Sequence, residues 1–335
     1  MSVFSRPMKS GRMFSSPFRF LLSVAFLLSV ALSNLGASER IYSENGFSIR
    51  VRYNETARPG DAVFVRLDVT APELKSGSGD SARLTLYVNG SPSRKADFYS
   101  LEKAGSPSSM LAGIPLSTWW TPEVSFHLNV SYRPAGKSGF GFDLPFKLSA
   151  KKFNSETIVL NQANTEIRTN TSTEKQKQSA NLYEIISTKN MSSVFQAAPF
   201  TAPTDSKRFT SCFGDRRVFV YSTGSKATSE HYGNDYGIPT GTSVSACASG
   251  KVVFADWRIS TGYSVIIEHL PGLYSIYYHL SELKCKAGQT VNAGDLIAKS
   301  GATGLATGPH LHWEMRLNGE AVDPLFFLKD FAFTE

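Results

Sequence analysis

Four residues with metal-binding side chains lie in two short motifs in the last third of the chain. His231 and Asp235 begin and end the segment His-Tyr-Gly-Asn-Asp, and His310 and His312 form a His-Leu-His pair. Zn²⁺ prefers imidazole and carboxylate ligands, and a catalytic zinc site uses three protein ligands while leaving one position open for water. These residues can therefore supply the ligands of a zinc hydrolase.

The sequence around each motif predicts how the side chains are presented. Residues 310–315 alternate between polar and apolar side chains, which in a β-strand places His310, His312 and Glu314 on one face. Glycine and proline residues in and after 231–235 disfavour a helix there, so we expect a loop that runs into a strand. Each motif alone is common in proteins that bind no metal. The prediction therefore rests on their occurrence in one domain.

The first segment of the chain has the pattern of an export signal. Four basic residues precede an apolar run from Phe20 to Leu32, and small residues follow between 33 and 38. We expect residues 1–37 to be a signal peptide cleaved after the apolar run, and the alternative is an uncleaved N-terminal membrane anchor. In both cases the rest of the chain lies outside the cytoplasmic membrane, because the basic residues stay on the cytoplasmic side.

Charge and cysteine content narrow the class of protein further. The formal net charge of +7 falls to about +3 without the four basic residues of the export segment, which argues against a nucleic-acid partner. Cys212, Cys247 and Cys285 are an odd number without Cys-x-x-Cys spacing. We expect them to be buried small hydrophobic residues, and the alternative is one disulfide and one free thiol.

The 335 residues, 41% of them hydrophobic, are enough for two modest domains. Short alternating runs separated by turn signals predict an immunoglobulin-like β-sandwich over 46–151, in which His127 is a structural strand residue. Residues 152–204 read as a linker with one helix, which begins near Thr171 with Glu174 completing a capping box. Dense β signals predict a compact antiparallel β domain over 205–330, so the fold class is all-β dominated.

A longer series of motifs resembles a known family. The chain has, in order, Thr-Ser-Cys-Phe-Gly at 210–214, the His231 segment, Pro-Thr-Gly-Thr at 239–242, Tyr-Tyr-His-Leu at 277–280, Gly-Ala-Thr-Gly at 301–304 and Gly-Pro-His-Leu-His at 308–312. This series is similar to that of the M23 family of zinc metallopeptidases, which includes lysostaphin and LytM-type cell-wall endopeptidases. The resemblance covers about residues 208–328 and implies a peptidase fold there.

The resemblance also assigns residues. It implies one Zn²⁺ per chain bound by His231, Asp235 and His312, and it makes His310 and His279 the catalytic pair. We expect zinc-bound water to attack the scissile carbonyl with His310 as base and His279 stabilising the oxyanion, although the two roles could be exchanged.

Three further positions bear on the resemblance to the family. His269 is expected to be structural, held by hydrogen bonds inside a hairpin. Asn234 and Cys212 depart from the residues that are usual in the family, but neither change removes a metal donor.

The expected function is a zinc metallopeptidase that hydrolyses the peptide cross-links of bacterial peptidoglycan, in the periplasm or cell envelope. Its substrate is the peptidoglycan peptide, and a membrane is involved only if the N-terminal segment stays uncleaved. The alternative is a non-catalytic wall-binding or regulatory module that activates other wall hydrolases.

Overall fold

A computed structural model describes residues 38–44, 46–70, 80–101 and 108–333. The predicted signal or anchor segment, residues 1–37, lies outside the described residues. Within the described part of the chain, no helix has both the length and the apolar character needed to cross a membrane.

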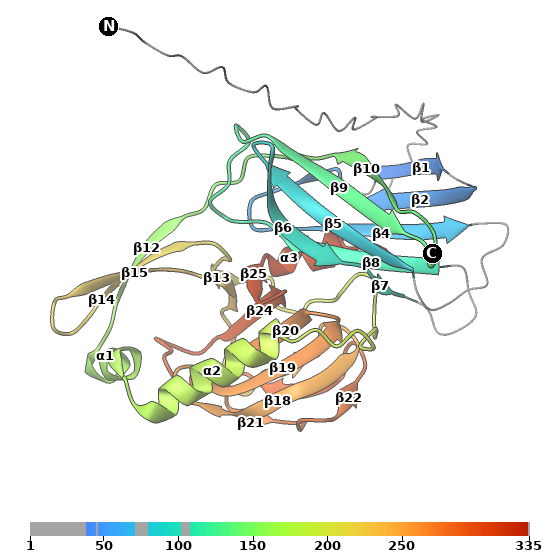
Figure 1. The fold of residues 1–335 in the computed structure, drawn as a ribbon. Coiled ribbons are helices and arrows are strands. Elements are labelled where there is room, and N and C mark those ends of the chain that lie inside the picture. The colour runs from blue at the N-terminus through green and yellow to red at the C-terminus, as the bar shows by residue number, and fades with distance from the viewer. Residues whose placement is uncertain (1–37, 45, 71–79, 102–107, 334–335) are drawn as a thin grey trace, which may run out of the picture.

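The N-terminal part is a sandwich of two antiparallel sheets (Figure 1). The first sheet has the order β1 (Ser38–Glu44), β2 (Phe47–Tyr53), β4 (Ala62–Thr70), β8 (Ser108–Pro115), β7 (Tyr99–Ser100). The second has the order β10 (Phe140–Pro145), β9 (Phe126–Arg133), β5 (Ser81–Val88), β6 (Ser91–Asp97). The short strands β3 (Thr56–Ala57) and β11 (Lys147–Leu148) pair beside them. Alternate residues of each sheet, such as Ile49 and Val51 of β2 and Leu84 and Leu86 of β5, form the core between the sheets.

The C-terminal part is built on one large antiparallel sheet. Its order is β13 (Phe209–Ser211), β16 (Gly233–Tyr236), β24 (Leu311–Leu317), β20 (Leu273–Leu280), β19 (Gly262–Leu270), β18 (Gly250–Arg258), β22 (Thr290–Val291), and β25 (Glu320–Val322) pairs with β24. A smaller sheet contains β17 (Ser243–Ser245), β23 (Leu296–Lys299) and β21 (Glu282–Leu283). The predicted hairpin at Pro271-Gly272 is confirmed: these two residues join β19 to β20, and Gly272 takes the positive φ of 77° that such a turn requires.

The predicted single helix of the linker was wrong, because the region contains a strand and two helices. They are β12 (Ser155–Val159), α1 (Gln162–Thr169) and α2 (Thr173–Ser187). The predicted helix corresponds to α2, but Ser172 rather than Thr171 caps it, with its side chain accepting from the backbone N–H of Lys175. Helix α1 has eight residues and no regular apolar stripe, so only the cap at Asn161 marks its start.

Strand β12 belongs to a small sheet of three strands. It pairs in parallel with β14 (Arg216–Val220), which forms a hairpin with β15 (Lys226–Glu230). This three-stranded sheet and α1 stand out to one side of the molecule, as Figure 1 shows.

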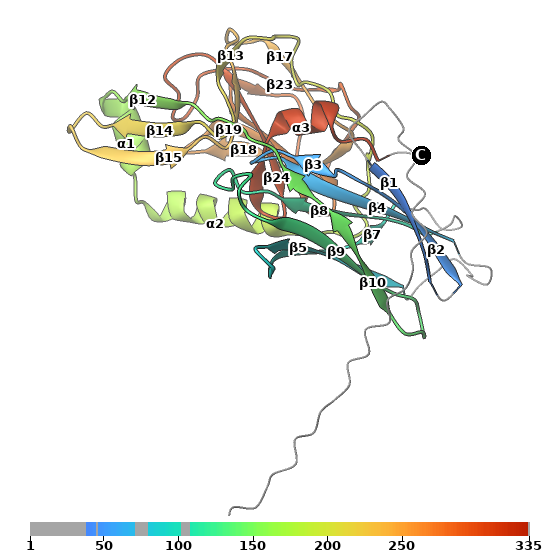
Figure 2. The same cartoon turned by 90° about the horizontal axis from the view of Figure 1, so that it is seen from above.

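The two β units share an aromatic interface. In β4 the side chains of Val63 and Val65 enter the sandwich core, whereas Ala62 and Phe64 belong to the core of the C-terminal part. The Phe64 ring lies 4.8 Å from that of Phe331 and 6.2 Å from that of Phe326 in α3 (Pro324–Lys329). Figures 1 and 2 both show α3 between the sandwich and the large sheet.

The expectation of three buried cysteines was only partly right. All three cysteines are free, but only Cys247 is buried, while Cys212 is exposed and Cys285 is intermediate. Cys212 lies in the turn between β13 and β14, where its backbone N–H donates to Asp215 and its carbonyl accepts from His231.

Candidate metal centre

Strand pairing brings the two predicted motifs together. His231 precedes β16, as expected for a loop that runs into a strand, and β16 pairs antiparallel with β24 so that Asp235 lies opposite His312. Residues directly opposite each other on paired strands project to the same face, about 5 Å apart. Two motifs separated by about 80 residues in sequence thus become neighbours.

The three predicted ligands form a compact donor group. One donor atom each from His231, Asp235 and His312 lies within 4.8 Å of the others, and all three side chains are buried. Asp235 Oδ1 is 2.7 Å from His312 Nδ1 and 3.2 Å from His231 Nε2. Among the residues that the structure describes, these three form the one group of histidine, cysteine or acidic side chains that could hold a metal ion.

The electrostatics of this group suit a cation. Burial lowers the pKa of His312, but Asp235 and Glu314 outweigh burial and raise it to about 9. Burial raises the pKa of Asp235, yet the two imidazoles hold it well below its usual range. The group thus stabilises positive charge at the point where the three donors converge. Two imidazoles and one carboxylate are also a donor set that divalent metals use, so the residues fit a metal ion.

Neighbouring acceptors orient the two imidazoles. His231 Nδ1–H donates to the carbonyl of Cys212 at 2.9 Å, which leaves Nε2 for a metal. His312 Nε2–H donates to Glu314 at 2.9 Å, which leaves Nδ1. The carboxylate of Glu314 is itself held by Arg316 at 2.7 Å. Burial raises the pKa of Glu314, but Arg316 and His312 lower it to about 2, so it stays an acceptor. Such partners fix ring orientation in metal sites.

The predicted catalytic pair stands beside the donor group. The rings of His279 and His310 are 4.6 Å apart, and His310 Nε2 is 3.8 Å from Asp235 Oδ1. Each ring donates its Nδ1–H to a backbone carbonyl at 2.8 Å, from His279 to Thr303 and from His310 to Gly308. When neutral, each ring therefore carries its lone pair on Nε2.

Burial keeps these two imidazoles neutral. It lowers the pKa of His310, and burial together with the neighbouring His310 lowers the pKa of His279 to about 3. His279 also has a φ of 60°, an unusual backbone conformation for a residue other than glycine. Backbone strain of this kind often marks functional positions.

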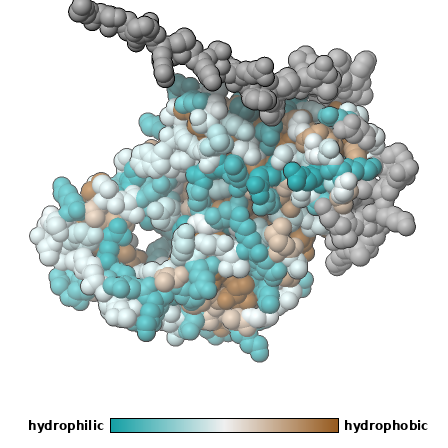
Figure 3. Space-filling view, in the orientation of Figure 1, coloured by the Kyte–Doolittle hydropathy of each residue, from teal (hydrophilic) through white to brown (hydrophobic). Residues whose placement is uncertain are grey.

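A pocket of about 290 Å³ opens at these residues. His279, His310 and His312 lie on the side of the large sheet, and Ile158 of β12 and Arg168 of α1 lie on the other side. Figure 3 shows a hollow between the lobe that carries α1, β14 and β15 and the rest of the molecule. The linker segment is thus one wall of the pocket.

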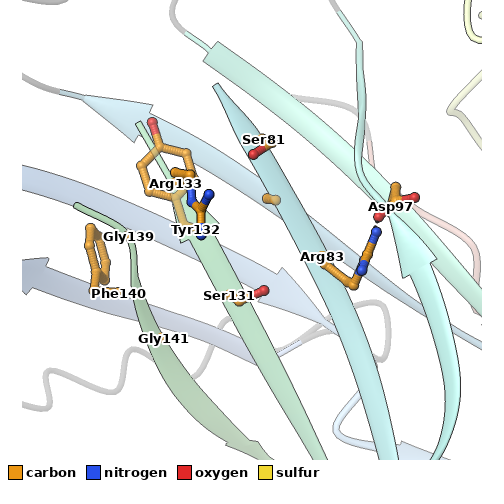
Figure 4. Close-up of a pocket in the computed structure, with 10 residues that line it drawn as sticks. Ser81, Arg83, Asp97, Ser131, Tyr132, Arg133, Gly139, Phe140 and Gly141 are labelled. Carbon is orange, nitrogen blue, oxygen red and sulfur yellow. Dashed lines mark hydrogen bonds and ion pairs between the residues drawn. The ribbon is translucent and has the colours of Figure 1, made fainter. Parts of the chain in front are cut away.

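A larger depression of about 590 Å³ lies on the sandwich, but it has no comparable chemistry. Figure 4 shows Arg83 turned toward Asp97, with which it forms an ion pair at 2.7 Å. No histidine or cysteine lines this depression in the described part of the chain.

The structure brings together all five residues predicted for the site and leaves the other two histidines elsewhere. His269 is fully buried and bonded to Ser249 and Ser275, as expected for a structural residue in the hairpin. His127 stacks on Tyr87 in the sandwich.

Two charged residues near the site had no assigned role in the sequence-based prediction. The alternation of polar and apolar residues in 310–315 places Glu314 on the same strand face as His312. This pattern is the sequence signal for the contact between the Glu314 carboxylate and the His312 ring. Arg217, which donates to Asp235 at 2.9 Å, had no sequence signal, because its contact depends on the pairing of β12, β14 and β15.

Comparisons with known proteins agree with this geometry. The sequence model of Peptidase family M23 matches residues 229–324. An uncharacterized metalloprotease of Haemophilus influenzae is 45% identical over 96 residues, which are 28% of this chain and 20% of that protein. The peptidoglycan DD-endopeptidase ShyA of Vibrio cholerae is 38% identical over 124 residues, 37% of this chain and 28% of that protein. The matched part thus spans less than a third of these relatives' own length.

One solved structure resembles most of the chain. A crystal structure of an M23 peptidase candidate from Pseudomonas aeruginosa superimposes with a TM-score of 0.52 at 22% identity, covering 83% of this chain and 96% of that one. This likeness concerns the fold alone. The family match lies in the segment that contains both ligand motifs and the histidine pair, and residues 229–324 are thus a Peptidase family M23 domain.

Proposed function

We propose that the protein is a zinc-dependent endopeptidase that hydrolyses peptide cross-links of bacterial peptidoglycan outside the cytoplasmic membrane. The observation that carries this proposal is the convergence of His231, Asp235 and His312 beside two neutral imidazoles in one open pocket. A donor set of this kind, with two free acid–base groups next to it, suits hydrolysis better than structural metal binding, which uses four protein ligands.

In this proposal His231 Nε2, His312 Nδ1 and Asp235 Oδ1 hold Zn²⁺. Bound there, Zn²⁺ would act as a Lewis acid toward the scissile carbonyl and would make water a better nucleophile near neutral pH. Zinc is favoured because its preferred ligands are imidazole and carboxylate in a three-ligand catalytic site.

His310 acts as the general base, because its Nε2 lone pair lies 3.8 Å from the carboxylate of Asp235 and its low pKa keeps it neutral. His279 stabilises the oxyanion. Because its Nδ1–H is engaged with Thr303, its Nε2 can donate to the oxyanion only once it carries a proton, and the attacking water supplies that proton through His310, whose ring is 4.6 Å away. The two rings have matching hydrogen bonds, so an exchange of the two roles is compatible with the same contacts.

The names of the relatives support the substrate. Besides ShyA, a DD-carboxypeptidase/endopeptidase of Neisseria meningitidis named Mpg is 42% identical over 95 residues, 22% of that protein. We extend a peptidoglycan peptide substrate to this chain on these grounds, and with it action in the periplasm or cell envelope.

We also propose that the sandwich is immunoglobulin-like. Its strands β2-β4-β8-β7 and β6-β5-β9-β10 follow the order A-B-E-D and C′-C-F-G of that fold.

We keep the division into a sandwich domain over 46–151, a linker over 152–204 and a peptidase domain over 205–330.

The test uses purified protein loaded with zinc and cross-linked peptidoglycan. Wild type should release peptide fragments, and His310→Ala should release at least 100-fold fewer in the same time, since a general base contributes about that factor or more. Equal release by the two proteins would contradict the assigned chemistry. Bound zinc without release by wild type would favour the alternative, a non-catalytic module that activates other wall hydrolases.

A further inference from the structure

Glu156, in the linker strand β12, lies outside the matched family segment but makes contacts that lead to two of the three candidate ligands. We propose that Glu156 is a positioning residue that holds Asp235 and His231 in the geometry needed for metal binding. The inference rests on the proposed metal centre and adds to it a support supplied by the linker.

The first connection runs through Arg217. The parallel pairing of β12 and β14 sets Glu156 opposite Arg217, whose Nε donates to Glu156 Oε1 at 2.5 Å. The other end of the same guanidinium donates from Nη2 to Asp235 Oδ2 at 2.9 Å. With Oδ2 engaged, Asp235 presents Oδ1 to the two imidazoles.

The second connection runs through Ser211. Its hydroxyl donates to Glu156 Oε1 at 2.9 Å and lies 3.3 Å from His231 Nδ1. The same Nδ1 faces the carbonyl of Cys212, the next residue along. Glu156 therefore anchors the loop that sets the ring orientation of His231.

The connection through Arg217 also affects the charge balance at Asp235. Arg217 is 85% buried at its side chain, and it stands against a carboxylate that has to bind a cation. Without Glu156 its positive charge would be compensated by Asp235 alone, and it would compete with the metal for that carboxylate. Glu156 takes up part of the charge of Arg217 and leaves Asp235 able to bind a second positive group.

The test measures zinc affinity rather than activity. Wild type, Glu156→Gln and Glu156→Ala are titrated with Zn²⁺ in competition with a chromophoric chelator. The matched control is Glu166→Gln, an exposed glutamate of α1 in the same linker, whose side chain accepts a hydrogen bond from Gln162. We expect both Glu156 variants to raise the zinc Kd about 10-fold or more, as the loss of outer partners does in metal sites. The control should stay within twofold of wild type.

Ser211→Ala separates the two connections. It breaks only the second one and should weaken zinc binding less than Glu156→Ala. Circular dichroism and thermal unfolding in the presence of a chelator report whether each variant folds, and Glu156→Gln keeps the side-chain volume in case the alanine variant does not.

The outcomes distinguish this inference from the proposed function. Glu156 variants that bind zinc as tightly as the control would overturn the positioning role and leave the metal centre standing. A wild-type protein that binds no zinc would overturn both. Loss of zinc affinity in the Glu156 variants with native circular dichroism would support the inference.

Discussion

At the scale of single residues, the histidines divide by what their ring nitrogens face. Those of the candidate site each give one nitrogen to a fixed acceptor and turn the other toward the pocket or the donor group. His269 differs, because both of its nitrogens are engaged, with Ser249 at 2.8 Å and Ser275 at 2.7 Å. It contributes to stability and has no free position for chemistry.

His269 should make folding sensitive to acid. Burial lowers its pKa to about 4 from an unfolded value of 6.5, so the folded state favours the neutral ring. The stabilisation of the folded state by the neutral His269 ring is therefore fully present above pH 6.5. It is lost as the pH falls toward 4, because the unfolded chain then binds a proton that the folded chain does not. We expect the free energy of unfolding of wild type to drop about 2 kcal/mol more between pH 7 and pH 4.5 than that of His269→Gln, in urea titrations. Parallel pH profiles for the two proteins would contradict this role.

At the scale of elements, the site depends on the close approach of β16 to β24. Gly233 lies opposite Glu314, and a Cβ built at Gly233 would come within 2.4 Å of the carbonyl of Trp313 and 2.9 Å of His312 Nε2. Only glycine fits there, because the first of these neighbours is backbone and cannot turn away. The glycine in the first motif is therefore part of what brings its aspartate to His312.

Gly233→Ala should separate the two strands at the metal donors. We expect stability to fall by about 1–3 kcal/mol, as overpacking in a core does. Zinc binding should weaken as well, since the pair His312–Glu314 would be displaced. Thermal unfolding and zinc titration measure the two effects. A variant that unfolds at the wild-type temperature and binds zinc normally would show that the strands tolerate the extra carbon.

The elements also show where sequence-based prediction reaches its limit. The strand with His312 was predictable, because alternation of polar and apolar residues reports which face is buried. β12 was not, since none of its residues is fully buried and its pairing with β14 is a tertiary contact between segments about 60 residues apart. The five predicted site residues came from motif spacing and family resemblance. The roles of Glu156 and Arg217 required the fold.

At the scale of the whole molecule, the sandwich and the peptidase part are joined through a common core. Phe64 of the sandwich is fully buried among the aromatic residues that follow β25, and its ring fills the space above Gly113, where a Cβ would lie 2.4 Å from it. Arg66 of the same strand donates to the carbonyl of Phe333 at 2.6 Å. Contacts of this kind couple the stability of the two parts.

Phe64→Ala should therefore weaken the entire chain and not the sandwich alone. We expect a loss of about 3–5 kcal/mol, the usual cost of removing a buried phenylalanine. Unfolding followed by circular dichroism and by tryptophan fluorescence should remain a single coincident transition in wild type. Two separate transitions in wild type would show that the parts unfold independently, and an unchanged stability in the variant would show that Phe64 does not stabilise the chain.

We propose that His231, Asp235 and His312 hold a zinc ion that serves peptide hydrolysis in peptidoglycan. Mass spectrometry of a defined cross-linked muropeptide dimer, incubated with the zinc-loaded protein, tests it most directly. The dimer should be converted to its two peptide-bearing halves, with the added mass of one water across the products, and should stay intact when zinc is removed by a chelator. A dimer that stays intact with zinc bound in a 1:1 ratio would contradict it.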